Sequence, residues 1–274
     1  MAVSTSLTKL YICPEAFLPI RNGGRRRVDD ILRIESGIPG LDRNIEGGFP
    51  NPMILIIEGE PGTGKSTFAL QMLFHNCEGK NRLYMTGISE PFENIRRNMG
   101  RHQFFKWDKV EQGHIHFIDL APAIGISAET RLKPMRESEI ELSEPFITII
   151  KEIEQYKPDM VVIDPLLVPF SAESLKYRKL FYNFFKVIRE LNTFLIVVKE
   201  TTDKTSRSVD NYMADGVLTL AIRPLADPCT EYRKILRVSK LRGTKHTPKL
   251  LQIEKDWEGM SLVPLEQDIV GSVP

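Results

Sequence analysis

The sequence is poor in cysteine, has no excess of charge of either sign and lacks a long apolar run. Its three cysteines, Cys13, Cys77 and Cys229, are odd in number and far apart, which argues against a disulfide framework or a zinc ribbon. Such cysteine usage is typical of a reducing compartment, so we expect a cytoplasmic protein. Lys and Arg total 37 against 36 Asp and Glu, whereas a protein that coats DNA is usually far more basic. No stretch approaches the roughly 18 apolar residues of a membrane span, so we expect no membrane partner.

Composition and length bound what the chain can build. An apolar share of 42% in 274 residues suits a packed core in one large domain or two small ones. Residues 1–31 are predicted to be an N-terminal extension, because RNGGRRRVDD (21–30) mixes glycine with charge as linkers do. The apolar YICPEAFLPI before it fits a tail packed on the surface, and an edge strand or a contact with another subunit are the alternatives. We therefore predict one domain over 32–264 and a C-terminal tail over 265–274.

Strand and helix patterns alternate from residue 53 onward. Continuous apolar runs predict strands buried on both faces, and apolar stripes at helical spacing predict helices between them. The predicted strands cover 53–59, 82–86, 114–120, 160–164, 194–198, 216–222, 234–241 and 249–255, and the predicted helices cover 65–78, 91–100, 146–157 and 174–191. The aromatic stripe of the last helix is predicted to be core, and 121–144 a long loop. This order predicts an α/β fold: a mostly parallel central sheet flanked by helices, with antiparallel strands at the C-terminal edge.

Residues 59–66, GEPGTGKS, match the phosphate-binding pattern G-x-x-x-x-G-K-[ST] at every position. Its glycines let the backbone curl so that successive N–H groups point at phosphate oxygens, and the helix that follows adds the positive end of its dipole. Lys65 is expected to bridge the β- and γ-phosphates of a nucleotide, and Ser66 to offer its hydroxyl to Mg²⁺. The predicted nucleotide-binding residues of this segment are Gly59, Glu60, Pro61, Gly62, Thr63, Gly64, Lys65, Ser66 and Thr67.

Two acidic residues are predicted to complete this site. A phosphate loop needs a carboxylate at the end of a neighbouring strand to hold Mg²⁺ and its water. Asp164, after the apolar run MVVI, is the predicted metal-binding partner of Ser66, and Asp119 is the alternative. Hydrolysis also needs a group that orients or deprotonates water. Glu90, which follows the predicted strand 82–86, is the candidate; alternatively it is an acidic residue placed at a helix N-terminus, where the dipole favours it.

Residues 239–246, SKLRGTKH, gather four basic side chains. Side chains two apart on a strand share a face, so Lys240 and Arg242 can point at one anionic target. That target is a nucleotide phosphate or a nucleic acid; otherwise the segment is a solvated end of a hairpin. The nucleic-acid interpretation is not favoured, because base stacking calls for aromatic residues among the charges and SKLRGTKHTPK has none. Binding to a nucleic-acid backbone needs only charge and stays open.

Together these segments resemble the KaiC branch of the RecA-like ATPases, which includes the cyanobacterial clock protein, archaeal KaiC-like proteins and the RadA paralogues. The resemblance covers about residues 33–263 and rests on SGIPGLD (36–42), GGFP (47–50), MADGVLTL (213–220) and, most specific to this branch, KLRGTKH (240–246). It implies a RecA-like P-loop NTPase core and, typically, a hexameric ring with ATP between subunits. It also implies that Lys240 and Arg242 act with Lys65 and Glu90 in catalysis, by reaching the γ-phosphate bound by the adjacent subunit.

The sequence departs from the family pattern at one place. The family commonly has two adjacent glutamates after the second strand, and here that pair reads Ser89-Glu90. The expected function is an oligomeric, Mg²⁺-dependent ATPase that works as an ATP-driven switch, with ATP and Mg²⁺ as cofactors and copies of the chain as partners. Two alternatives remain: a DNA-recombination accessory ATPase like the RadA paralogues, and a nucleotide-bound scaffold in which Ser89 marks lost hydrolysis.

Overall fold

The computed structural model describes residues 32–86, 92–120, 133–134, 141–166, 175–201, 209–224 and 232–265. These residues contain a nine-stranded sheet with the strand order β13-β12-β11-β10-β3-β9-β8-β4-β5. Its strands are Ile54–Gly59 (β3), Arg82–Thr86 (β4), Ile115–Asp119 (β5), Met160–Asp164 (β8), Phe194–Glu200 (β9), Gly216–Pro224 (β10), Tyr232–Leu241 (β11), Leu251–Lys255 (β12) and Met260–Pro264 (β13). Two short antiparallel pairs lie outside it: Arg33–Ile34 (β1) with Phe49–Pro50 (β2), and Lys133–Pro134 (β6) with Glu141–Leu142 (β7).

The direction of the strands confirms the predicted fold class. The six strands from β10 to β5 pair in parallel, and β3 lies between β9 and β10. The strands β11, β12 and β13 continue the sheet in antiparallel pairs at one edge. Because parallel strands carry their carboxyl ends to the same edge, the last residues of β3, β4, β8 and β9 lie at one edge of the sheet.

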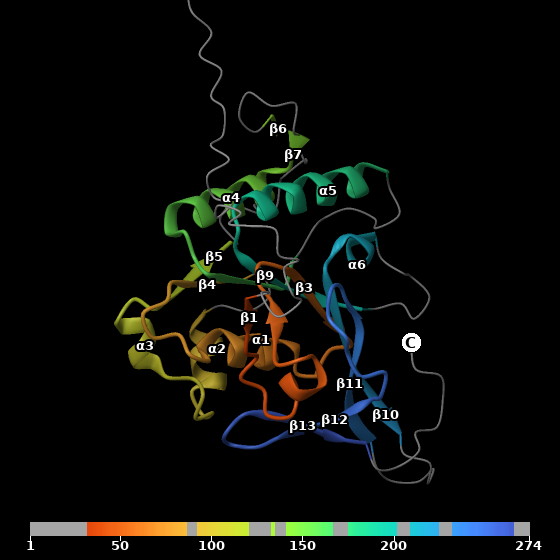
Figure 1. Cartoon of the computed structure of the whole chain (residues 1–274). Coiled ribbons are helices and arrows are strands. Elements are labelled where there is room, and N and C mark those ends of the chain that lie inside the picture. The colour runs from red at the N-terminus through yellow and green to blue at the C-terminus, as the bar shows by residue number, and fades with distance from the viewer. Residues whose placement is uncertain are drawn as a thin grey trace, which may run out of the picture. The chain divides into compact units, whose positions relative to one another are not determined.

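Helices cover both faces of the sheet. They are Lys65–Phe74 (α1), Phe92–Met99 (α2), Trp107–Glu111 (α3), Glu144–Tyr156 (α4), Leu175–Glu190 (α5) and Val209–Met213 (α6), with a short 3₁₀ turn at Asp42–Asn44 (η3). Figure 1 shows α1, α2 and α3 on one side of the sheet and α4 and α5 on the other. No helix in the described part of the chain is both long and apolar enough to cross a membrane.

Alternating side chains of β3 supply the two cores. Leu55 and Ile57 pack in the cluster that contains the apolar side of α1, whereas Ile54 and Ile56 pack in the cluster that contains α4 and α5. All four side chains are at most 1% exposed. Burial on both faces explains why the strand is a continuous apolar run and does not alternate with polar residues.

The aromatic stripe on α5 is core, as predicted. Phe181, Phe184 and Phe185 are at most 1% exposed. Phe146 of α4 stacks on Phe184 with ring centroids 4.4 Å apart and meets Phe181 edge to face. These contacts fix α4 against α5 over the sheet. The three buried phenylalanine rings of α5 are therefore not available as a binding surface.

Several element boundaries differ from the prediction. The first helix was predicted over 65–78 but ends at Phe74, and β13 was not predicted. Within the predicted loop 121–144, the described residues include the paired strands β6 and β7 and the first residue of α4. The predicted extension 1–31 lies outside the described residues, as does the tail from residue 266.

Candidate functional site

The loop between β3 and α1 lies at the carboxyl end of a central strand. Gly59 runs so close to β10 that a Cβ there would lie 2.2 Å from the carbonyl oxygen of Leu220. Gly64 caps α1 with a φ of 102°, a left-handed conformation that glycine adopts at little cost. Inside the loop, the Thr63 hydroxyl and the Lys65 ammonium donate hydrogen bonds to the carbonyl oxygen of Glu60, at 2.8 and 3.0 Å. Only glycine fits the first position, and these hydrogen bonds hold the loop curled.

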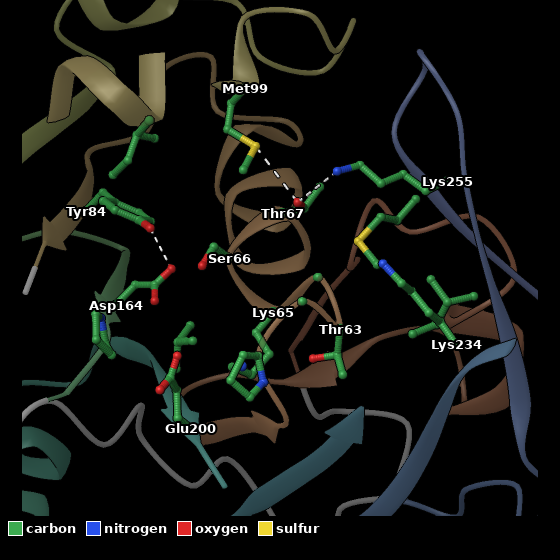
Figure 2. Close-up of a pocket in the computed structure, with 18 residues that line it drawn as sticks. Thr63, Lys65, Ser66, Thr67, Tyr84, Met99, Asp164, Glu200, Lys234 and Lys255 are labelled. Carbon is green, nitrogen blue, oxygen red and sulfur yellow. Dashed lines mark hydrogen bonds between the residues drawn. The ribbon is translucent and has the colours of Figure 1, made fainter. Parts of the chain in front are cut away.

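A cavity of about 360 Å³ adjoins this loop (Figure 2). Residues 61–67 form one wall. The other lining residues are Tyr84, Ile95, Met99, Asp164, Pro165, Val198, Glu200, Lys234, Ile253, Lys255 and Met260. They come from α2 and from strands across most of the sheet, so the cavity exists only in the assembled fold. Its volume lies in the range of small-molecule sites.

Lys65 is buried beside this cavity, in the first turn of α1. Burial lowers the pKa of its ammonium below the usual range, while the carboxylates of Glu200 and Asp164 act in the opposite direction. The ammonium therefore sits between the loop carbonyl of Glu60 and two acidic side chains. A phosphate group placed against it would favour its charged form further.

Asp164 ends β8 and faces Ser66 across the cavity (Figure 2). It is buried, and its Oδ2 accepts a hydrogen bond from the Tyr84 hydroxyl at 2.6 Å. Tyr84 lies on the adjacent strand β4, so the parallel pairing of β4 with β8 brings donor and acceptor together. The bond orients the carboxylate toward the cavity. A serine hydroxyl and an oriented carboxylate on opposite walls are the ligands that a Mg²⁺-nucleotide site uses.

Other predicted site residues lie elsewhere. Asp119, the alternative to Asp164, ends β5 beyond β4, and it is exposed and absent from the described lining of the cavity. Gly59 and Glu60 belong to the phosphate loop but are not among the described residues that line the cavity. The Glu60 carboxylate instead lies 3.6 Å from the guanidinium of Arg223. The predicted catalytic residue Glu90 and its neighbour Ser89 lie outside the described residues.

Sequence reasoning missed three charged side chains that line the cavity. Glu200 is the last residue of β9, and an acid that ends a buried strand is the same signal that identified Asp164. Lys234 of β11 and Lys255 of β12 come from the antiparallel edge. Their strands were predicted, but pairing with the edge of a parallel sheet, which carries them to the loop, has no short-range sequence signal.

Lys240 and Arg242 share one target on their own chain and are not among the described residues that line the cavity. The carbonyl oxygen of Tyr212, near the end of α6, accepts from Lys240 Nζ at 2.7 Å and from Arg242 Nη2 at 3.1 Å. Lys240 also donates to the Asn211 carbonyl, and Arg242 lies 3.6 Å from the Asp215 carboxylate. Arg242 is in the turn after β11, so convergence depends on that turn and not on a shared strand face.

A second set of contacts joins α6 to the strand before the phosphate loop. The Asn211 side-chain amide donates to Glu58 Oε2 at 2.6 Å, and the Thr219 hydroxyl donates to Glu58 Oε1 at 3.1 Å. Glu58 directly precedes Gly59 in β3. Asn211 thus donates to Glu58 through its side chain and accepts from Lys240 through its backbone carbonyl. These two hydrogen bonds connect Lys240 to the residue that directly precedes the phosphate loop.

Relatives of known name match most of the chain. A model of the KaiC ATPase family matches residues 34–267. The circadian clock protein KaiC3 of Synechocystis sp. PCC 6803 is 28% identical over 231 residues, which cover 81% of this chain and 43% of that protein. A UPF0273 protein of Thermotoga maritima is 26% identical over 246 residues, which cover 86% of this chain and 98% of that protein. The chain therefore spans less than half of one relative and nearly all of the other.

A solved structure has the same fold. The crystal structure of a KaiC-like protein from the hyperthermophilic archaeon Pyrococcus horikoshii OT3 matches with a TM-score of 0.68 at 24% identity, covering 85% of this chain and all of that one. This likeness shows a shared architecture. The family match extends from β1 to just past β13 and includes the phosphate loop and every described residue that lines the cavity. The chain belongs to the KaiC family of ATPases.

Proposed function

We propose that this chain is a cytoplasmic, Mg²⁺-dependent ATPase that binds ATP in the cavity beside the phosphate loop. The carrying observation is the convergence of Lys65, Ser66 and Asp164 on that cavity. Backbone N–H groups of the loop and the start of α1 would bind the β- and γ-phosphates, and Lys65 would bridge them. Mg²⁺, held by Ser66 and Asp164, would neutralise charge that develops on the phosphates during transfer.

Hydrolysis needs a group that orients the attacking water. Glu90 is the proposed base, because it follows β4, whose carboxyl end lies beside Asp164. Ser89 stands where the family commonly has the first of two adjacent glutamates, so only one of the two carboxylates is retained. We therefore expect slow turnover that depends on Glu90. Phosphoryl transfer is catalysed mainly by positioning and charge stabilisation, so loss of a water-orienting carboxylate lowers turnover without abolishing ATP binding.

Nucleotide sites between copies of the chain are the second part of the proposal. Lys240 and Arg242 converge on one point but not on the cavity of their own chain. In a ring of identical subunits, this pair would reach the γ-phosphate held by the neighbour and stabilise charge there. The contacts from Lys240 through Asn211 to Glu58 would link each subunit's basic pair to its own phosphate loop.

Multiple-turnover release of phosphate from Mg·ATP tests the activity. We expect the wild-type protein to release phosphate, and we expect Lys65→Ala and Glu90→Gln to lower the rate of release at least about 100-fold. Lys80→Ala is the control: it removes an exposed lysine that is not among the described residues lining the cavity, and it should leave the rate unchanged. ATP binding should survive in Glu90→Gln. Binding without any turnover in the wild type would replace the ATPase with a nucleotide-bound scaffold, and absence of binding would overturn the proposal.

A further inference from the structure

The cavity is electrically divided. Asp164 and Glu200 lie at one end, whereas Lys234 and Lys255 lie at the other, with Lys65 and Ser66 between them (Figure 2). Lys255 Nζ donates a hydrogen bond to the Thr67 hydroxyl at 3.3 Å. Thr67 follows Ser66 in the first turn of α1, so the lysine end adjoins the side of the loop remote from the acids.

The two lysines have little to neutralise them. Among the described residues, neither forms an ion pair with a carboxylate. Lys255 is exposed overall, but partial burial of its ammonium lowers the pKa, and the charge of Lys234 lowers that pKa further. Like charges held near each other disfavour the free site, and an anion placed between them would relieve the repulsion.

This inference rests on the proposed function, binding of Mg·ATP in the cavity. The separation of acidic and basic side chains then indicates which phosphate of the nucleotide lies between Lys234 and Lys255. The acids belong with Mg²⁺ and the terminal phosphate, because Asp164 faces Ser66. The opposite end then receives the α-phosphate and the nucleoside. Ile253 and Met260 line the cavity near Lys255 and offer an apolar surface, which suits a base more than a phosphate.

We propose that Lys255, supported by Lys234, binds the α-phosphate of the nucleotide and so selects triphosphates over shorter phosphate chains. The α-phosphate takes no part in cleavage of the bond to the γ-phosphate. Its contacts therefore stabilise the ground state and the transition state equally, which changes KM and leaves kcat unchanged. The two lysines are specificity-determining residues and not part of the group that performs hydrolysis.

Three ligands with Mg²⁺ separate the parts of the nucleotide in calorimetric titrations of the full chain. ATP carries all three phosphates and a nucleoside, methyl triphosphate carries the three phosphates alone, and pyrophosphate fills only the two positions at Lys65. In Lys255→Met we expect Kd to rise about tenfold for ATP and methyl triphosphate and to stay unchanged for pyrophosphate. Lys234→Met should show a smaller rise of the same pattern, and Lys80→Met none.

Other results would overturn this assignment. Weaker binding of ATP alone would place the lysines beside the base. Equally weakened binding of all three ligands would mean that the lysines act through their overall charge or are needed for folding. Unchanged binding of all three would mean that the lysines are solvated surface residues. A KM raised about tenfold in Lys255→Met with kcat within twofold of wild type supports the α-phosphate contact independently. Wild-type protein that binds the three ligands as expected but hydrolyses nothing would retain this inference while contradicting the ATPase.

Discussion

Lys65 has a lowered pKa because it is buried, even though two carboxylates lie nearby. Phosphate groups would raise that pKa, so ATP binding should take up protons at pH values between the lowered pKa of the free protein and the higher pKa of the complex. Affinity should therefore fall as pH rises through this range. Calorimetry in buffers of different ionisation enthalpy measures the uptake. Lys65→Arg, whose side chain stays charged, should reduce it, and unchanged uptake in that variant would contradict the assignment.

The same shift has the opposite sign for the stability of the free protein. A lysine whose pKa is lowered by folding binds fewer protons in the folded state than in the unfolded chain. The free energy of unfolding contributed by Lys65 therefore rises with pH until the ordinary lysine range is passed. ATP affinity and the stability of the free protein should change in opposite directions over one pH interval.

Residues that the chemistry of the loop demands could be predicted from sequence, and residues that reach the cavity through tertiary pairing could not. Lys65 and Ser66 stand at fixed spacing in a motif, and Asp164 ends a clean apolar strand. Lys234 and Lys255 look like the exposed charges of any edge strand until β13 and the start of α1 are placed beside them. Tyr84 is a buried aromatic whose hydroxyl gains its role from the strand next to it.

At the level of elements, α1 depends on a side chain from the next strand. The buried Arg82 of β4 donates to the carbonyl oxygens of Leu73 and His75 at 2.5 and 2.6 Å, and to those of Met72 and Asn76. The Met72 and Leu73 carbonyls lie in the last turn of α1 and lack partners within the helix, and His75 and Asn76 directly follow it. Arg82 thus caps the helix that carries Lys65 and Ser66.

Removal of this cap should destabilise the protein. Arg82→Met keeps an apolar stem but leaves several carbonyls without their donor, and we expect the free energy of unfolding to fall by about 2–4 kcal/mol. Urea unfolding followed by circular dichroism measures the change. The exposed Arg97→Met is the control and should stay within about 0.5 kcal/mol of wild type. An equal effect of both substitutions would show that the cap contributes nothing.

The bounds of an element were predicted correctly where its own sequence determines them, and incorrectly where contacts with distant segments determine them. The strands 82–86 and 160–164 have the predicted bounds, because continuous apolar runs end there at a charged or turn-forming residue. β13 reads only as a short alternation, MSLVP, and becomes a strand because β12 offers an edge to pair with. The end of α1 depends on Arg82, and no helix pattern in 65–78 could show it.

For the whole molecule, assembly is the property to test. We expect Mg·ATP to raise the mass of the wild-type protein measured by light scattering to that of a ring, because nucleotide would bridge adjacent copies. Lys240→Ala/Arg242→Ala should remove this increase while retaining ATP binding. The exposed pair Lys80→Ala/Arg97→Ala is the matched control. If the basic double variant assembles like wild type, the pair does not read a neighbour's nucleotide, and single-stranded DNA becomes the next anion to titrate.

The parallel order of the sheet also sets when the site can first exist during synthesis. β3 leaves the ribosome early, but its neighbours in the sheet begin only at Phe194 and Gly216, and the last strand that lines the cavity begins at Met260. Until those segments emerge, a nascent chain carries the phosphate loop on an apolar strand with two open edges. Newly made chains should therefore engage chaperones before they engage nucleotide, and a ribosome stalled ahead of β10 should display a phosphate-binding motif that binds no phosphate.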